Sequence, residues 1–232
     1  MSILLLRLTG MQSWGTRSRF CRRDTELHPS KSGVFGLLCA ALGKPRIEST
    51  GDGFPTLPQL SQLKMAIRVD RQGSVACDYQ TASDVLQADG KSIKETELSW
   101  RDYISDGDFV VALEGDDDLI ERLADAVRNP VHALYLGRKA FPPTMPVFAG
   151  VVKGKSILEA LSNVEWLKYQ PYEKEPQDKR LKVIIESDSG RLINDIPIRF
   201  VDKNRMFAAR TLEDIWIDLP IVKEWITCGS QN

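Results

Sequence analysis

Arginine residues surround two aromatic residues near the start of the chain, and this pattern has the clearest chemical potential. Aromatic side chains stack on unpaired bases, which contributes roughly 1–3 kcal/mol per base, and guanidinium groups bind phosphates. The segment therefore predicts a site for single-stranded RNA. The alternative is a solvated basic loop whose rings pack in the core. The residues concerned are Trp14, Arg17, Arg19, Phe20, Arg22 and Arg23.

A second candidate is the sequence Ser30-Lys31-Ser32-Gly33, which stands where a helix is expected to begin. Free backbone N–H groups at a helix start, together with an ammonium group and two hydroxyls, favour phosphate oxygens. The alternative is ordinary capping of the helix by Ser30. The spacing of the residues is compatible with both interpretations.

A third candidate is the segment Tyr135–Pro143, in which Gly137 is followed by Arg138 and Lys139. A glycine beside two cations lets the backbone and the charges approach one phosphate chain together. The alternative is a turn that ends a strand. We expect this loop to lie next to the arginine-rich loop, so that the two form one basic surface.

Residues suited to catalysis are scarce in this chain. Metal-free RNA cleavage needs an acid/base pair, and His28, close to Lys31, is the only histidine in a suitable setting. The run Asp116–Asp118 is explained by capping and the dipole of a helix that begins there. Gly10 and Gly15 have Walker A spacing, but Thr16 and Arg17 replace the required Lys-Ser/Thr. We expect no cofactor, no metal and no catalytic residue.

The hydrophobic pattern predicts the elements that position these residues. We expect strands over 3–8, a half-buried strand over 64–70, and further strands over 109–113 and 131–136. Helices are expected over 31–42, between Ser30 and Gly43, and over 116–128. An Asp-Gly turn at 89–90 indicates a projecting hairpin over about 72–107.

Without the hairpin, the predicted order is βαββαβ, which is typical of the ferredoxin-like or RRM-like α+β fold. Two helices would cover one face of the sheet and leave the other face open for RNA. We expect this core over 1–147 and a small β-rich C-terminal subdomain over 148–232.

The net charge of −1 and the pI of about 6.2 exclude a protein that is basic over its whole surface. The charges are nevertheless unevenly distributed. Residues 1–46 carry eight basic and two acidic side chains, and residues 126–158 carry five basic and no acidic ones. An acidic block over 106–125 separates them. The longest apolar run, 34–42, is too short to span a bilayer, and four scattered cysteines favour a reducing, cytoplasmic location without membrane contact.

Four ordered blocks carry a family resemblance. They are LLLRLTGMQSWG, RDTELHPSKSGVFGLLCAALG, SWRDYISDGDFVVAL and YLGRKAFPP. Over about residues 3–150 the chain resembles the CasD family, subunits of the type I-E CRISPR surveillance complex Cascade in the RAMP (repeat-associated mysterious protein) superfamily. The resemblance implies an RRM-like core with a thumb hairpin. It implies antiviral defence by a non-catalytic, RNA-binding subunit that caps the 5′ handle of CRISPR RNA (crRNA).

The resemblance also implies partners and site residues. The partners are the crRNA 5′ handle, the Cascade large subunit and the terminal backbone subunit, with target DNA reached only through the complex. The resemblance and the basic loops together predict the following RNA-binding residues: Gln12, Trp14, Arg17, Arg19, Arg22, Lys31, Ser32, Gly33, Tyr79, Lys91, Lys94, Arg101, Gly137, Arg138 and Lys139.

Two alternative functions stay open at this point. The first is a metal-independent endoribonuclease that cleaves CRISPR repeat RNA, with His28 and Lys31 near its centre. The second is a scaffold whose acidic segment over 106–125 docks a basic neighbour, with RNA contact incidental.

Overall fold

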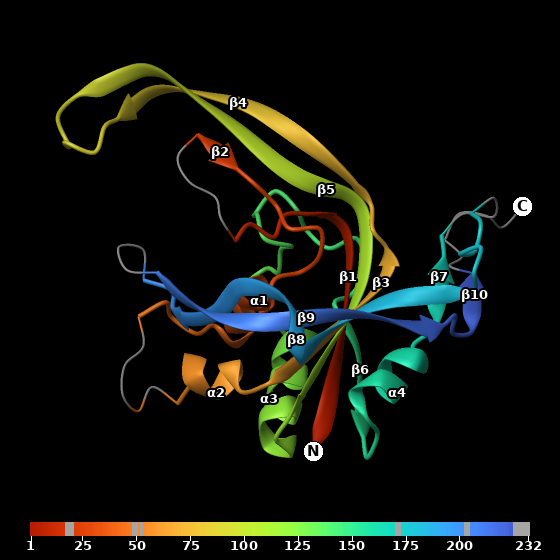
Figure 1. Ribbon diagram of the computed structural model, residues 1–232. Coiled ribbons are helices and arrows are strands. Elements are labelled where there is room, and N and C mark those ends of the chain that lie inside the picture. Colours follow the sequence, from red (N-terminus) through yellow and green to blue (C-terminus); the bar gives the residue numbers. More distant parts are fainter. Residues whose placement is uncertain (17–20, 48–50, 52, 170–172, 202–204, 225–232) are drawn as a thin grey trace, which may run out of the picture.

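The computed structural model describes residues 1–16, 21–47, 51, 53–169, 173–201 and 205–224. The fold is α+β, and its described strands form one eight-stranded, largely antiparallel sheet and a separate strand pair (Figure 1). The main path through the sheet is β6-β1-β5-β3-β8-β9. These strands are β1 (Ser2–Gln12), β3 (Lys64–Arg71), β5 (Ile93–Gly115), β6 (Phe148–Lys153), β8 (Arg180–Arg199) and β9 (Met206–Asp218).

Three helices pack on one side of this sheet. The predicted helix over 31–42 is confirmed as α1 (Lys31–Leu42), with Ser30 as its N-cap and Gly43 in the left-handed region at φ +71°. The helix expected after Asp116 is α3 (Asp117–Arg128), and α2 (Leu57–Ser61) is a short helix between α1 and β3. Their apolar side chains meet Leu4, Leu6 and Leu8 of β1 in the main core.

The opposite face of the sheet is covered as well, so the expectation of an open face is wrong. The helix α4 (Ile157–Ser162) packs there against Ile3, Leu5 and Val110 in a second apolar core. The pair β7 (Trp166–Lys168) and β10 (Val222–Glu224) continues this layer. The unbroken apolar run at the start of β1 is typical of a strand that is buried on both sides.

Buried charges fasten the C-terminal layer to the sheet. Arg68 is fully buried, and its Nε donates to Asp70 Oδ1 at 2.6 Å. The same guanidinium group donates to the carbonyl of Leu161 in the last turn of α4 (2.5 Å) and to that of Val164, just after the helix (2.7 Å). The strand over 64–70 is therefore not half-buried as predicted, because its polar residues face an internal partner instead of water.

A second group of charges lies beside this one. Asp108 accepts from Arg7 Nη1 at 3.0 Å and from Tyr169 Oη at 3.0 Å. Burial, followed by the charge of Asp108, raises the pKa of Tyr169 to about 12, so the phenol stays protonated and can donate. Arg71 lies over the Tyr169 ring, with 4.3 Å from its guanidinium carbon to the ring centroid. These contacts bind Tyr169, the residue after β7, to the core.

The strand predicted over 131–136 is absent, and this prediction is wrong. That segment is held by single hydrogen bonds, such as Val131 N–H to Ala41 O at 2.9 Å, and not by a strand ladder. The strand that completes the sheet beside β1 is β6, which begins at Phe148. The sheet therefore continues across the predicted boundary at residue 147, and the division into two domains stays a prediction.

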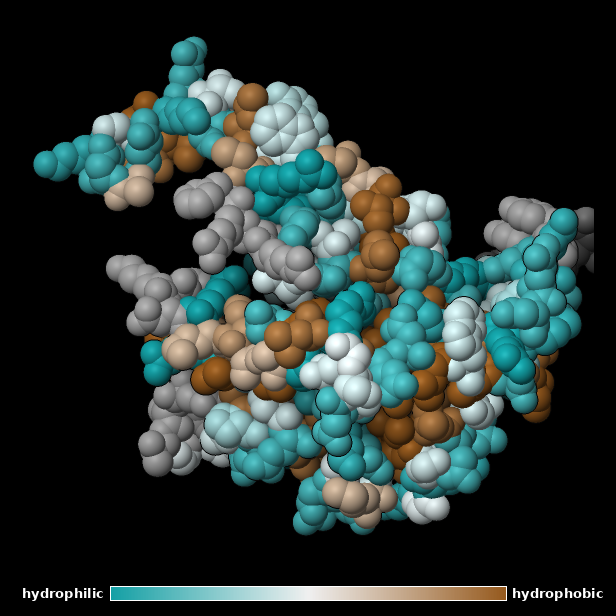
Figure 2. Space-filling model, viewed as in Figure 1, coloured by the Kyte–Doolittle hydropathy of each residue, from teal (hydrophilic) through white to brown (hydrophobic). Residues whose placement is uncertain are grey.

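A long hairpin projects from the sheet where the sequence predicts one. It consists of β4 (Ser74–Leu86) and the first half of β5, and it arches away from the rest of the molecule (Figures 1 and 2). Asp89 closes the tip by accepting from the backbone N–H groups of Lys91 and Ser92, both at 2.9 Å. A hydrogen bond from the Ser92 hydroxyl, followed by these two backbone bonds, lowers the pKa of Asp89 to about 2.

We expect the substitution Arg68→Met to lower the free energy of unfolding by about 3–5 kcal/mol, because it leaves buried carboxylate and carbonyl groups short of partners. Urea denaturation followed by circular dichroism measures this change. The matched control is Arg180→Met, since the Arg180 side chain is largely exposed. A loss below about 1 kcal/mol for Arg68→Met would show that the buried contacts do not hold the C-terminal layer.

Candidate nucleic-acid interface

The first basic segment begins with a buried hydrogen-bond chain. Trp14 Nε1 donates to Gln12 Oε1 at 2.8 Å, and Gln12 Nε2 donates to the carbonyl of Gly107 at 3.0 Å. Trp14 is 1% exposed, and its ring lies against Gly33, where a Cβ would stand 2.6 Å from it. The ring is therefore in the core, as the alternative interpretation held. This geometry gives Gln12, Trp14 and Gly33 a positioning role, and their contact with RNA stays a prediction.

The start of α1 already has an internal anion. The backbone N–H of Lys31 donates to Asp195 Oδ2 at 2.7 Å, and Ser30 Oγ accepts from the N–H of Gly33 at 3.2 Å. The Lys31 ammonium is 1% exposed and donates to Glu186 at 2.8 Å. A carboxylate of β8 thus occupies the place in which the sequence predicts a phosphate. Lys31 and Ser32 lie at a junction between α1 and β8, and their contact with RNA is untested.

His28 is buried beside the same junction. Its Nε2 accepts from Arg191 Nη2 at 3.0 Å, and this contact leaves Nδ1 to donate to the carbonyl of Pro29 at 3.2 Å. Burial is the main cause that lowers the pKa of His28 below 6.5, and the positive charge of Arg191 lowers it further. A buried, neutral histidine with both nitrogens engaged is poorly placed to accept a proton from an RNA hydroxyl.

An exposed basic cluster lies at the base of the hairpin. The short strand β2 (Arg22–Arg23) pairs in parallel with β5 and places Arg23 opposite Arg101. Arg138 approaches from the loop before β6. Partial burial, followed by the charges of Arg101 and Arg23, lowers the pKa of Arg138, while the charges of Asp78 and Asp102 act in the opposite direction. We call Arg23, Arg101 and Arg138 the arginine cluster.

Gly137 positions Arg138 in this cluster. At φ +88° it crosses the chain so closely that a Cβ would stand 1.8 Å from the carbonyl oxygen of Ser13. Arg138 Nη2 then donates to the carbonyl of Asp102 at 2.9 Å, while its buried Nη1 has no hydrogen-bond partner in the described part of the chain. An unpaired buried donor is unfavourable, so this N–H group is suited to donate a hydrogen bond to an anionic oxygen of a ligand.

Two aromatic rings lie exposed on the hairpin, on the face opposite the arginine cluster, because Trp100 and Arg101 are successive residues of β5. Tyr79 and Trp100 are opposite residues on β4 and β5, with ring centroids 5.5 Å apart and exposures of 57% and 41%. Arg22 of β2 pairs with Trp100 and donates to Asp102 Oδ2 at 3.2 Å. Trp100 was missed from the sequence. A hairpin centred on Asp89-Gly90 places residue 79 opposite residue 100, which was the available signal.

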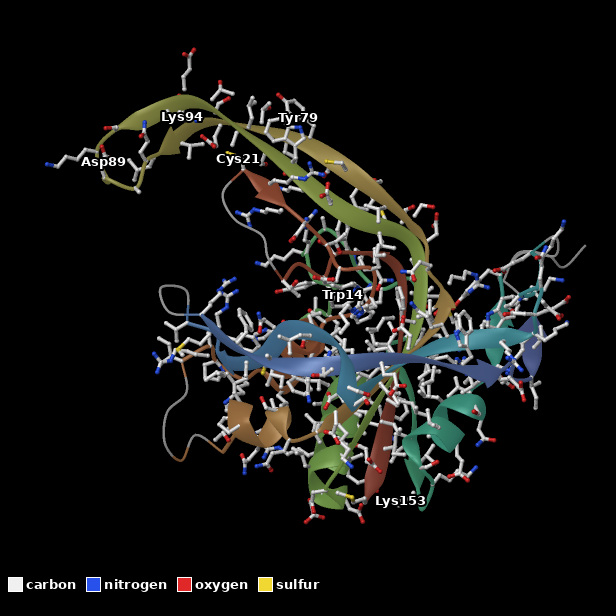
Figure 3. All side chains as sticks on the ribbon, viewed as in Figure 1. Trp14, Cys21, Tyr79, Asp89, Lys94 and Lys153 are labelled. Atoms are coloured by element: carbon white, nitrogen blue, oxygen red, sulfur yellow. The ribbon has the colours of Figure 1, made fainter. Side chains whose placement is uncertain are left out.

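The other predicted contacts are spread more widely. Lys91 and Lys94 lie at the exposed tip, far from Trp14, and Lys94 donates to Glu97 at 2.5 Å, which raises its pKa (Figure 3). Lys139 is exposed next to the arginine cluster in sequence. Arg17 and Arg19 lie outside the described residues. The structure thus brings Arg101, Gly137 and Arg138 together and adds Arg23, while Arg22 and Tyr79 lie with Trp100 on the other face of the hairpin.

Two further observations concern the described residues only. No group of three histidine, cysteine, aspartate or glutamate side chains among them could hold a metal ion. No helix in the described part of the chain is long and apolar enough to cross a membrane.

Comparisons with known proteins agree with this architecture. Residues 3–213 match the family model described as CRISPR-associated protein (Cas_Cas5). The CRISPR system Cascade subunit CasD of Escherichia coli (strain K12) is 36% identical over 179 residues, which cover 71% of this chain and 77% of that protein.

Two solved structures extend the likeness to the whole fold. One is a chain of a CRISPR RNA-guided surveillance complex, with TM-score 0.79, 29% identity, and coverage of 95% of this chain and 92% of the other. The second is a crystal structure of a Cas protein, with TM-score 0.70, 36% identity, and coverage of 94% and 98%. The fold is therefore that of a CRISPR-associated protein. The chain belongs to the Cas5 family.

We expect Gly137→Ala to displace the loop that carries Arg138, because the added methyl group meets a backbone oxygen at an already strained φ. The melting temperature should fall, and the affinity for single-stranded RNA should fall with it. Gly154→Ala is the matched control, since Gly154 has φ +68° but open space around its Cβ position. Equal effects of the two substitutions on stability and RNA affinity would contradict the role given to Gly137.

Proposed function

We propose that this chain is a non-catalytic RNA-binding subunit of the type I-E CRISPR surveillance complex, Cascade, and that it caps the 5′ handle of crRNA. The observation that carries the proposal is the arginine cluster, in which Arg138 Nη1 has no hydrogen-bond partner among the described residues. The exposed pair Tyr79–Trp100 lies on the other face of the same hairpin. Membership of the Cas5 family, and the likeness to CasD and to a surveillance-complex chain, support the choice of complex.

The topology supports a ferredoxin-like, RRM-like core within this proposal. The order β1-α1-β3-β5-α3-β6 along the chain, with β6-β1-β5-β3 across the sheet, is the βαββαβ arrangement expected from the sequence. The hairpin of β4 and β5 then corresponds to the thumb. The layer of α4, β7 and β10 covers the sheet face that RRM proteins use for RNA, so the handle must bind at the base of the thumb.

The chemistry of this site suits a single strand rather than a duplex. Three guanidinium groups on one face of the hairpin can neutralise phosphates, and two exposed rings on its other face can stack on bases that are unpaired. The buried contacts of Gln12, Trp14 and Gly33 then support the site indirectly, because they position the residues at the end of β1. Lys91 and Lys94 at the tip would reach RNA or a neighbouring subunit beyond the cluster.

The proposal includes the large subunit and the terminal backbone subunit of Cascade as protein partners, with target DNA reached only through the complex. The proposed absence of catalysis is supported by the burial of His28 and Lys31, the pair on which the endoribonuclease alternative depends. Burial also lowers the pKa of Lys31, but its ammonium is held by Glu186 and does not face solvent.

The triple substitution of Arg23, Arg101 and Arg138 by alanine tests the site. Each arginine that neutralises one phosphate contributes about 0.7 to the slope of log affinity against log salt, so the triple variant should lose about 2. Filter binding of a single-stranded handle RNA at several salt concentrations measures the slope, and gel analysis should show the RNA uncut without metal.

The control for this measurement is the double substitution Lys179→Ala and Arg180→Ala, which removes exposed cations at the start of β8. It should leave affinity and slope unchanged. If the triple variant keeps wild-type affinity and slope, the handle does not bind at the arginine cluster. RNA cleavage by the wild type that disappears in His28→Ala would support the endoribonuclease instead.

Shortening the hairpin distinguishes the role of the base of the thumb from the role of its tip. Replacing residues 84–95 by Asn-Gly joins Ser83 to Thr96, which are already opposite each other, through a tight turn. We expect an unchanged melting temperature and retained handle binding, because the removed residues lie outside the core. Incorporation into the complex, measured by size-exclusion chromatography, should weaken. Unfolding of the shortened chain would show that the tip is structural.

A further inference from the structure

The strand β6 forms one edge of the main sheet. Among the described residues it pairs only with β1, and its first five residues, Phe148–Val152, are all apolar or glycine. The outer N–H and C=O groups of such a strand are a template for another strand. The opposite edge, β9, carries charged residues at Glu213, Asp214 and Asp218, which discourage such pairing.

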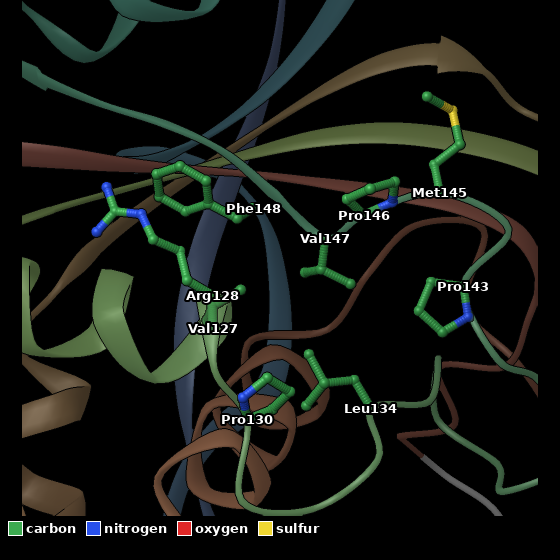
Figure 4. Close-up of a pocket in the computed structure, with 9 residues that line it drawn as sticks. All are labelled: Val127, Arg128, Pro130, Leu134, Pro143, Met145, Pro146, Val147 and Phe148. Carbon is green, nitrogen blue, oxygen red and sulfur yellow. The ribbon is translucent and has the colours of Figure 1, made fainter.

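Two hollows open beside β6, one on each face of the sheet. The α3 hollow has a volume of about 460 Å³ and is lined by Val127, Leu134, Val147 and Phe148, with prolines at its rim (Figure 4). The α4 hollow has a volume of about 400 Å³, and its lining includes Leu5, Gly150, Val152, Ala160 and Val164. In Figure 1, β6 lies between α3 and α4, in agreement with this arrangement.

Strand geometry connects the two hollows. Phe148 and Val151 face the α3 side, while Val152 faces the α4 side, because a bulge at Ala149 shifts the register with β1. Successive side chains of an added strand point to opposite faces. One extended segment paired with β6 would therefore place neighbouring side chains in the α3 hollow and the α4 hollow.

The charges around β6 favour a protein segment over nucleic acid. Two cations beside β6 are already held by carboxylates of α3, Arg128 by Asp125 at 2.7 Å and Lys153 by Glu121 at 2.9 Å. Arg7, which lines the α4 hollow, is held by Asp108 at 3.0 Å. The helix α3 carries four carboxylates and two guanidinium groups. A phosphate backbone would meet the net negative charge of α3, whereas a lysine or arginine would meet a partner there.

We propose that β6 is a docking edge for an extended segment of a neighbouring protein subunit, which adds as a strand. The segment has apolar side chains at successive positions for the two hollows and a basic residue toward α3. Backbone hydrogen bonds supply affinity, and the hollows supply specificity. The inference rests on the proposed function only for the choice of the partner complex, because the surface itself is separate from the arginine cluster.

The test uses Ala149→Arg, which places a long charged side chain at an exposed position of β6. The matched control is Ala209→Arg at an exposed position of the other edge strand, β9. Each variant is co-expressed with crRNA and the other Cascade subunits, and co-elution in size-exclusion chromatography measures incorporation. Amide hydrogen exchange of the wild type, alone and in the complex, reports on residues 148–153. Handle binding by the isolated chain is measured in parallel.

We expect Ala149→Arg to be lost from the complex while its handle binding is unchanged, and Ala209→Arg to be incorporated normally. The amides of 148–153 should exchange more slowly in the complex. Normal incorporation of Ala149→Arg, or equal exchange in both states, overturns the docking edge but leaves the RNA function intact. Loss of handle binding in Ala149→Arg overturns it in favour of an RNA surface. Dimerisation of the isolated wild type through 148–153 overturns it in favour of a second copy.

If the wild type itself fails to co-elute, the proposed function and the chosen partner fall together. That result is distinguishable from failure of the docking edge alone, in which the wild type and Ala149→Arg co-elute equally.

Discussion

The strand β5 is the constraint on which the rest of the structure depends. It pairs with β1, β2, β3 and β4, so one continuous backbone forms part of the core and one arm of the hairpin. At the transition between these parts, the carbonyl of Asp102 accepts from Ser13 and Arg138, and its carboxylate accepts from Arg22. The basic loops are thereby fixed to the strand that carries Trp100.

Internal carboxylates decide which of the cations can meet an external anion. Asp195 accepts from the start of α1 and from Arg210, with distances of 2.6 and 2.8 Å to the guanidinium nitrogens. Glu186 holds Lys31 and Arg210 in the same network. These carboxylates join α1 to β8 and occupy the phosphate site that the sequence predicts at the start of α1. In the arginine cluster, by contrast, Arg138 Nη1 has no hydrogen-bond partner in the described part of the chain.

The sequence by itself determined the local elements, because their signals lie within a few neighbouring residues. Ser30 and Gly43 bound α1, Asp116 caps α3, and the turn at 89–90 fixes the hairpin and its register. The ordered motifs also placed the chain in its family, and the positions of Gly137 and Arg138 indicated a basic loop. The α+β class followed from these elements.

Only the tertiary structure decided which polar residues face water, because burial depends on segments that are distant in sequence. Arg68 alternates with apolar neighbours as a solvent-facing residue would, but its partners are carbonyls more than 90 residues away. Lys31 and Trp14 have the chemistry of RNA contacts, but β8 and α1 enclose them. The fourth core strand was missed for the same reason, since β6 is selected by its pairing with β1 and not by local pattern.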